Sequence, residues 1–213
     1  MKCASNHQFQ RKLFICVLSA CTVLQITACA PLVLGTAALA GKVVIDRRTP
    51  GIQVEDEAIE LRTESGLRGI LPKNAHVKVS SYNRMVLLTG QVNSESEKGV
   101  AERFAKSQDN VKSVVNDLVI GPESTLTQRA KDQLITTQVR AVLVQAKDIH
   151  SSAVHIVTQS GVVYLMGRLT LAEGARVSSL VSGSQVSGIQ KVIKVFEIIS
   201  EEDLQRLVAP SLR

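Results

Sequence analysis

The chain has 213 residues, of which 45% are hydrophobic and 21% charged, and this balance excludes an intrinsically disordered protein. The formal net charge is +6, but Lys2, Arg11 and Lys12 lie within the first 28 residues, so part of the basic balance belongs to a targeting segment. All four cysteines lie at or before Cys29, which excludes a disulfide framework in the remainder, and Cys-x-x-Cys and His-Glu-x-x-His metal motifs are absent.

The N-terminus has the organisation of an export signal. Positive residues precede a mostly apolar stretch at 13–26, which is too short for a membrane-spanning helix of about 20 residues. The stretch ends in Ile26-Thr27-Ala28-Cys29, which resembles the bacterial lipobox: an aliphatic residue, two small residues and a cysteine. The sequence therefore predicts a lipoprotein signal peptide at 1–28 and a diacylglycerol thioether on Cys29.

Two alternatives to acylation at Cys29 remain open. Leu18-Ser19-Ala20-Cys21 also fits a lipobox, although it leaves a short apolar segment before it. An ordinary cleaved signal with incidental cysteines is the other alternative. Because one acyl chain gives only marginal membrane binding, the two or three chains of a lipoprotein are needed for firm anchoring. Ala30 after the cysteine resembles the sorting pattern of Gram-negative outer-membrane lipoproteins.

A small, apolar segment follows the predicted anchor. Residues 30–45 read APLVLGTAALAGKVVI, and Arg47, Arg48, Pro50 and Gly51 then interrupt this pattern. Proline and glycine commonly mark the edges of structural elements. We expect an apolar linker over 29–53 and a domain boundary at its end.

Two later stretches are near copies of each other. Residues 85–92 read MVLLTGQV and residues 162–169 read VVYLMGRL. An alternating apolar and polar segment precedes each stretch, and a two-residue turn candidate joins the pair, Asn83-Arg84 in the first copy and Ser160-Gly161 in the second. Alternation is typical of a half-buried strand, so the sequence predicts the same β-hairpin twice.

The flanks of the two hairpins repeat as well. Helical stretches at 94–108 and 172–184 follow the hairpins, and final strands are expected near 115–120 and 192–199. Each unit therefore reads α-β-β-α-β, an α+β fold in which two helices cover one face of a three-stranded sheet. Upstream of each hairpin, matching residues fall on one helical face: Asp56, Ile59 and Leu67 in the first copy, and Asp132, Ile135 and Leu143 in the second.

This order of elements resembles the BON domain. The resemblance rests on an Asp-x-x-Ile-x-x-x-Val helix, an apolar-apolar-x-Leu-x-Gly strand and a Gly-Ile/Val-x-x-Val turn. Two such units behind a lipobox are similar to outer-membrane lipoproteins with two BON domains. The resemblance implies tandem BON domains at 54–122 and 126–200, and it does not account for the tail at 201–213.

Three glycines are expected to serve the fold. Gly90 and Gly167 recur at the end of the second hairpin strand, where a bulge or turn is the simplest role. Gly188 is expected to permit the turn into the last strand. The first copy has Asn110 at the corresponding place, where the BON family usually has glycine.

No catalytic motif is present. The sequence has no Gly-x-Ser-x-Gly elbow, phosphate loop or dinucleotide fingerprint. His76, His150 and His155 are expected to be solvated or to cap turns. We therefore expect no enzyme activity, no metal and no cofactor other than the covalent acyl group. The export signal and the aromatic content of 3% disfavour a nucleic-acid partner.

The two copies differ in charge. Residues 54–122 hold nine Lys or Arg against ten Asp or Glu, whereas residues 126–200 hold eight against four. The first helix of the second copy has a partly apolar stripe beside its core face, bordered by cations, which is the layout of a helix that lies in a membrane interface. The predicted phospholipid-binding residues are Lys131, Leu134, Thr137, Gln138, Arg140, Ala141, Val144 and Lys147.

The sequence and the resemblance together favour a non-enzymatic, periplasm-facing outer-membrane lipoprotein. We expect its second BON domain to bind anionic phospholipid and, as the resemblance implies, to support envelope integrity. An alternative is an adaptor that docks outer-membrane assembly proteins or cell-wall enzymes, with lipid binding incidental. A second alternative for the apolar stripe is that it packs against the first domain.

Overall fold

A computed structural model of the chain describes residues 46–208. The predicted signal peptide, Cys21, Cys29 and most of the linker lie outside this range. No helix within it has the length and apolarity needed to cross a bilayer. In chain order the elements are α2 (Pro50–Ile70), β1 (His76–Tyr82), β2 (Met85–Val92), α3 (Glu95–Lys106), β3 (Ser113–Asn116), β4 (Val119–Ile120), α4 (Leu126–Gln145), the 3₁₀ turn η1 (Ser151–Ala153), β5 (Val154–Gln159), β6 (Val162–Leu169), α5 (Leu171–Ser182), β7 (Lys191–Ile198) and α6 (Glu201–Val208).

The two repeats have the same strand topology. In the first repeat β1 pairs antiparallel with β2, and β3 pairs parallel with β2 on its other side. In the second repeat β5 pairs antiparallel with β6, and β6 pairs parallel with β7. Both hairpin turns have two central residues with positive φ, Asn83-Arg84 and Ser160-Gly161, which is the backbone of a type I′ turn. The α+β fold predicted from the sequence is therefore confirmed.

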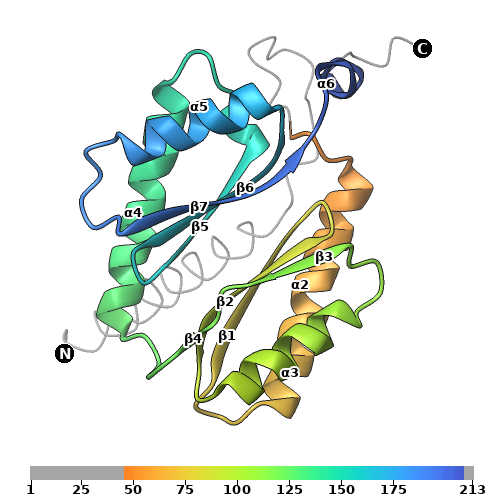
Figure 1. The fold of residues 1–213 in the computed structure, drawn as a ribbon, viewed down its shortest axis with the longest axis vertical. Coiled ribbons are helices and arrows are strands. Elements are labelled where there is room, and N and C mark those ends of the chain that lie inside the picture. The colour runs from red at the N-terminus through yellow and green to blue at the C-terminus, as the bar shows by residue number, and fades with distance from the viewer. Residues whose placement is uncertain (1–45, 209–213) are drawn as a thin grey trace, which may run out of the picture. The chain divides into compact units, whose positions relative to one another are not determined.

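One face of each sheet is covered by two helices (Figure 1). In the second repeat, Ile135, Val139 and Leu143 of α4 pack with Val177 and Val181 of α5 on the apolar residues of β5 and β6. The spacing of four residues along α4 brings these side chains onto one stripe. The first repeat builds the same core from α2, α3 and its sheet.

The opposite faces of the two sheets share a third core. It joins residues of both repeats: Tyr82 and Leu87 from the first, and Val157, Tyr164, Met166 and Val195 from the second. All six are buried. The central strands β2 and β6 are consequently buried on both sides, and this explains why their sequences are apolar at almost every position instead of alternating.

The third strand of the first sheet differs from the prediction of one strand near 115–120. It is divided into β3 and β4, both of which pair with β2. The interruption at Asp117 and Leu118 lies opposite the part of β2 that contains Gly90, whose φ is +117°. A Cβ on Gly90 would lie 2.0 Å from the carbonyl oxygen of His76. Gly167 has no positive φ, and β7 runs beside β6 without a break.

The start of α2 also differs from the expected boundary. Thr49 is its N-cap and accepts a hydrogen bond from the amide of Ile52, and Pro50 occupies the first turn. Proline is favoured there because the missing N–H has no acceptor within a helix. Pro50 and Gly51 thus begin the first repeat instead of ending a linker. At the other end of the described range, residues 201–208 of the unassigned tail form α6.

Candidate functional site

Seven of the eight predicted lipid-binding residues lie on the exposed side of α4, and Lys147 lies in the turn that follows the helix. Every one of the eight is solvent-exposed, and Leu134 and Val144 are each 63% exposed. The alternative in which this stripe packs against the first repeat is wrong. We call this set the α4 basic face: Lys131, Leu134, Thr137, Gln138, Arg140, Ala141, Val144 and Lys147.

The sequence of α4 forces this face outward. Thr125 caps the helix by accepting from the amide of Gln128, and the core stripe buries Asp132, Ile135, Val139 and Leu143. Residues between these positions therefore point away from the sheet. Two large apolar side chains remain exposed beside cations, which is the composition of an interfacial helix.

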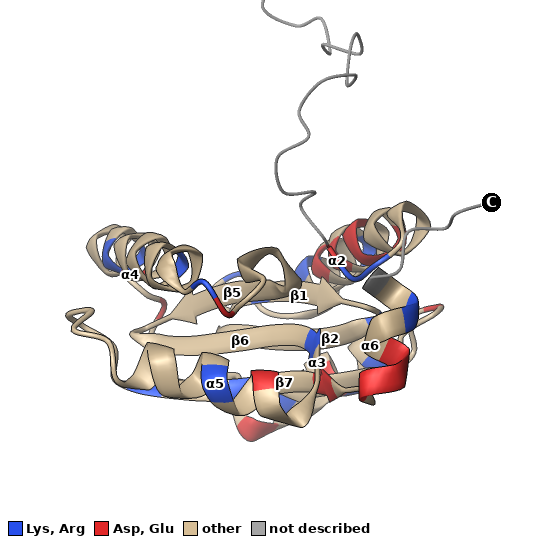
Figure 2. Cartoon of the chain, turned by 90° about the horizontal axis from the view of Figure 1, so that it is seen from above, with Lys and Arg blue, Asp and Glu red and all other residues tan. Residues whose placement is uncertain are grey.

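Three cations on the α4 basic face are unpaired. Within residues 46–208, Lys131, Arg140 and Lys147 form no ion pair. In contrast, Arg129 pairs with Glu123 before the helix. The only acid in α4 is Asp132, which is buried. The face therefore presents positive charge without an acidic neighbour on the same helix (Figure 2).

The corresponding helix of the first repeat has the opposite character. Figure 2 shows acidic residues along α2. Val54 and Leu61 are 66% and 70% exposed, so α2 also presents apolar side chains to solvent. The carboxylates of α2 would repel an anionic surface. The two helices therefore have matching positions in their domains but suit ligands of different charge.

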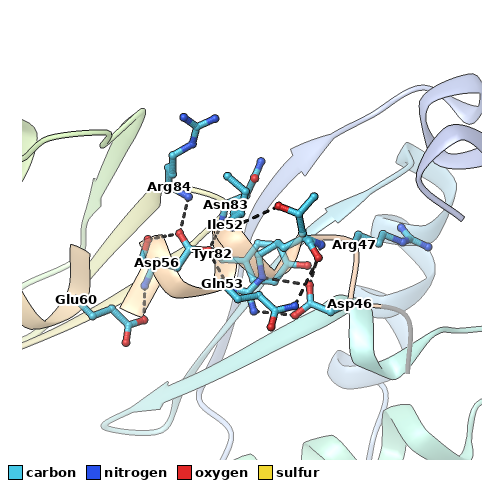
Figure 3. Close-up of polar contacts among 12 residues, drawn as sticks. Asp46, Arg47, Ile52, Gln53, Asp56, Glu60, Tyr82, Asn83 and Arg84 are labelled. Carbon is cyan, nitrogen blue, oxygen red and sulfur yellow. Dashed lines mark hydrogen bonds and ion pairs between the residues drawn. The ribbon is translucent and has the colours of Figure 1, made fainter. Parts of the chain in front are cut away.

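A buried carboxylate fastens each hairpin turn to the preceding helix, a role that the sequence did not reveal. Asp56 accepts from the amides of Asn83 and Arg84 at 2.8 and 2.7 Å, and from the Ser81 hydroxyl at 2.7 Å (Figure 3). Arg48 also pairs with it at 2.8 Å. The sequence places Asp56 on the same helical face as Ile59, but no sequence pattern links Asp56 to the amides of the hairpin turn.

The second repeat uses Asp132 in the same way. Its carboxylate accepts from the amides of Ser160 and Gly161 at 2.8 and 2.9 Å and from the side chain of Gln128 at 3.2 Å. Among residues 46–208 no arginine pairs with it, and its charge is stabilised by these N–H donors. The Asp of the repeated helix motif is therefore a structural residue in both copies.

Comparison with known proteins identifies the repeats. A profile described as the BON domain matches residues 60–122 and 131–200. The chain belongs to the BON-domain family. We refer to the two repeats below as the first and second BON domains.

Two curated relatives cover most of this chain. It is 33% identical over 177 residues to "Outer membrane lipoprotein DolP" of Haemophilus influenzae, covering 80% of this chain and 89% of that protein. It is 30% identical over 157 residues to a "21 kDa hemolysin" of Actinobacillus pleuropneumoniae, covering 73% and 80%. The first match confirms the predicted DolP-like family and a lipid-anchored location in the outer membrane.

Among solved structures, the chain is similar to CdsD, a structural protein of the type III secretion system of Chlamydia trachomatis. The match has 16% sequence identity and a TM-score of 0.29, and it covers 73% of this chain and 69% of that chain.

The segment before α2 is fixed to both BON domains. Arg47 is 3% exposed; it pairs with Glu173 of α5 at 2.6 Å and donates to the carbonyl of Arg168 at 2.7 Å. Arg48 lies over the ring of Tyr82, with its guanidinium carbon 4.2 Å from the ring centroid. Arg47 and Arg48 therefore hold the beginning of the described range against both domains.

The structure describes three histidines, His76, His150 and His155. His155 was expected to be solvated, but burial lowers its pKa and its ring lies 6.4 Å from that of Tyr82. His155 is therefore only partly solvated, because this face of β5 lies against the first BON domain. Within residues 46–208 no group of three His, Cys, Asp or Glu side chains is arranged to hold a metal.

The turn before the last strand uses the same backbone in both domains. Gly188 has a φ of +92°, and Asn110 has a φ of +65° at the corresponding place in the first domain. Asparagine is one of the few side chains that enters the left-handed region readily, so it can replace the family's glycine there.

Proposed function

We propose that this BON-domain protein is a non-enzymatic lipoprotein that faces the periplasm and binds anionic phospholipid through its second BON domain. The observation that carries the proposal is the α4 basic face, with its three unpaired cations and two exposed large apolar side chains. Support of envelope integrity, which the resemblance to BON-domain lipoproteins implies, is part of the same proposal. Acylation at Cys29, with Cys21 as the alternative, belongs to the same proposal, and the mass of the mature N-terminus distinguishes them.

Two weak contributions add up in the free energy of membrane binding, one electrostatic and one apolar. Each Lys or Arg near an anionic surface contributes about 1 kcal/mol, so three cations contribute about 3 kcal/mol. Burial of the exposed apolar side chains in the interface adds to this, and the acyl anchor keeps the helix close to the surface. The helix is therefore suited to select among lipids, while the anchor provides attachment.

We expect Arg140→Glu with Lys147→Glu to weaken binding to anionic vesicles by about 30-fold or more. Loss of two cations removes about 2 kcal/mol, and the new carboxylates add repulsion. The measurement is co-sedimentation of the non-acylated chain from Lys42 onward with vesicles of increasing anionic content. Omitting the acyl groups leaves only binding by the folded part.

The matched control is Lys73→Glu with Lys112→Glu. Both lysines are exposed in the first BON domain, and the change in net charge is the same. We expect this control to bind like the parent chain. If both double variants lose the same affinity for anionic vesicles, the effect is due to net charge alone. If binding does not depend on the anionic content of the vesicles, the proposal is contradicted.

A second candidate function is an adaptor for envelope proteins such as outer-membrane assembly proteins or cell-wall enzymes. The exposed apolar residues Val54 and Leu61 on the acidic helix α2 favour it, because this surface suits a protein better than an anionic lipid. Photo-crosslinking from Leu61 in intact membranes tests it. One stoichiometric protein product would support the adaptor, and a diffuse set of products would count against it.

A further inference from the structure

The outer edge of β5 has backbone groups without partners. Within the described range of 46–208, β5 is an edge strand that pairs only with β6, and its two-residue turn places Gln159 opposite Val162 as a hydrogen-bonded pair. Alternation along the ladder then directs the N–H and C=O groups of Ile156 and Thr158 away from β6. Among residues 46–208, no hydrogen bond to these outward groups is formed.

The first BON domain closes the same edge with carboxylates. Glu60 accepts from the amide of Ser81 at 2.6 Å, and Glu64 accepts from the amide of Val79 at 3.1 Å. These glutamates lie on α2 four residues apart, above β1. A carboxylate that occupies an outward amide blocks the addition of another strand.

The second domain replaces both glutamates. At the spacing that relates Asp56 to Asp132, the position of Glu60 is taken by Thr136 and that of Glu64 by Arg140. The Thr136 hydroxyl donates to the Thr158 hydroxyl at 2.7 Å, which leaves the Thr158 amide open. Ile156 and Thr158 are 5% and 7% exposed, so most of each residue is buried while its outward backbone groups have no acceptor or donor within residues 46–208. Each outward amide therefore gains free energy from an acceptor.

A cavity of about 210 Å³ lies along this edge. Its wall includes Ile156 and Thr158 of β5, Gln133 and Thr136 of α4, and Lys78 of β1. Lys78 is exposed and forms no ion pair within residues 46–208, like Arg140 of the α4 basic face. Lys78 therefore lies in the cavity wall itself, and Arg140 follows Thr136 by one turn of α4. The wall also contains Asp132, whose carboxylate accepts from the amides of Ser160 and Gly161.

The electrostatic environment of β5 also reflects the two cations, Lys78 and Arg140. Burial lowers the pKa of His155, and the charges of Arg140 and Lys78 are among those that lower it further. Both cations are therefore close enough to act on the middle of the strand. A ligand with negative charge is favoured there over a neutral one.

We propose that the outer edge of β5 binds an extended acidic segment of another protein as an added β-strand. The backbone of the segment pairs with the outward groups of Ile156 and Thr158, as in other complexes formed by strand addition. Its acidic side chains lie near Lys78 and Arg140. This surface is separate from the exposed apolar stripe of the α4 basic face, and the proposal does not depend on lipid binding.

The test uses the mature acylated chain in nanodiscs of zwitterionic lipid. The probe is a synthetic decapeptide of alternating valine and glutamate, and its control is the same peptide with N-methyl groups on its two central residues. Binding is followed by fluorescence anisotropy, and amide exchange at Ile156 and Thr158 by NMR. We expect exchange at both amides to slow at least tenfold on binding, and the methylated peptide to bind at least tenfold more weakly.

Thr136→Glu restores the glutamate of the first domain and should weaken peptide binding at least tenfold. Its matched control, Thr127→Glu, adds the same charge at an exposed position in the first turn of α4 and should leave peptide binding unchanged. Both variants should bind anionic vesicles alike, which separates this proposal from the lipid function. Native exchange rates elsewhere in β5 and β6 show that each variant is folded.

Four results would overturn the proposal. The methylated peptide binding equally well would leave charge alone as the cause. Unchanged exchange at Ile156 and Thr158 would exclude strand pairing. Protection of the two amides before peptide is added, lost on deletion of residues 30–45, would assign the edge to the chain's own segment. Slowing of the same amides by anionic vesicles, without peptide binding, would assign it to lipid headgroups.

Discussion

Asp56→Asn is expected to lower the free energy of unfolding by about 4 kcal/mol, because breaking a buried charge pair by removing one partner costs about 3–5 kcal/mol. Asp56 is 2% exposed and serves four donors. The amide of asparagine keeps one acceptor oxygen but turns an NH₂ group toward the donors. The guanidinium of Arg48, only 14% exposed, then loses one of its two carboxylate partners.

The matched variant is Asp132→Asn. It removes the same carboxylate from the second BON domain, where two turn amides and Gln128 are the donors and no arginine is involved. We expect a loss of about 2 kcal/mol, since only uncharged donors are left with a poorer acceptor. Urea denaturation followed by circular dichroism measures both. Equal losses would show that Arg48 contributes nothing to the difference, and losses below 1 kcal/mol would contradict the role of the carboxylates.

The part of the fold that follows from local pattern was predictable. The hairpin turns could be predicted because a connection of two residues between alternating segments permits only a few turn types. The helix faces were recognised because Ile59 and Ile135 recur with matched spacing, and duplication supplied an internal check on both. The exposure of Leu134 and Val144 also followed from helical periodicity.

Contacts between distant parts of the chain could not be derived in this way. Arg47 and Glu173 are 126 residues apart, and no local pattern links them. The partial burial of His155 also depends on the first domain, and its position on the polar side of β5 does not reveal this. One clue was present: MVLLTGQV and VVYLMGRL are apolar on both strand faces, which is typical of strands covered on both sides.

The candidate sites differ in the same respect. The α4 basic face depends almost entirely on one helix, so charge and periodicity were enough to predict that its residues are exposed, while their role in lipid binding stays a prediction. The open edge of β5 is a relation between a strand and the helix above it. The difference between the two edges requires the structure, in which Glu60 accepts from the amide of Ser81 whereas Thr136 contacts the hydroxyl of Thr158 and not its amide.

Tyr164→Ala is expected to destabilise the chain by about 4 kcal/mol, within the range of about 3–5 kcal/mol for removing a buried aromatic side chain. Tyr164 is 2% exposed in the core shared by the two sheets, and its hydroxyl donates to the Asp117 carboxylate of the first domain at 2.6 Å. The variant leaves a cavity between the domains and an unpaired acceptor. Calorimetry should show a lower Tm and a broader transition, because the two BON domains lose part of their coupling.

Two further variants separate packing from the hydrogen bond. Tyr164→Phe keeps the ring and removes the hydroxyl, so a loss of about 1.5 kcal/mol is expected for a hydrogen bond to a charged acceptor. Leu171→Ala truncates a large side chain that is 75% exposed and should change stability by less than about 0.5 kcal/mol. If Tyr164→Ala unfolds with the stability of Leu171→Ala, the shared core does not join the domains. A large loss for alanine with a small loss for phenylalanine assigns the coupling to packing of the ring against Leu87 and its neighbours.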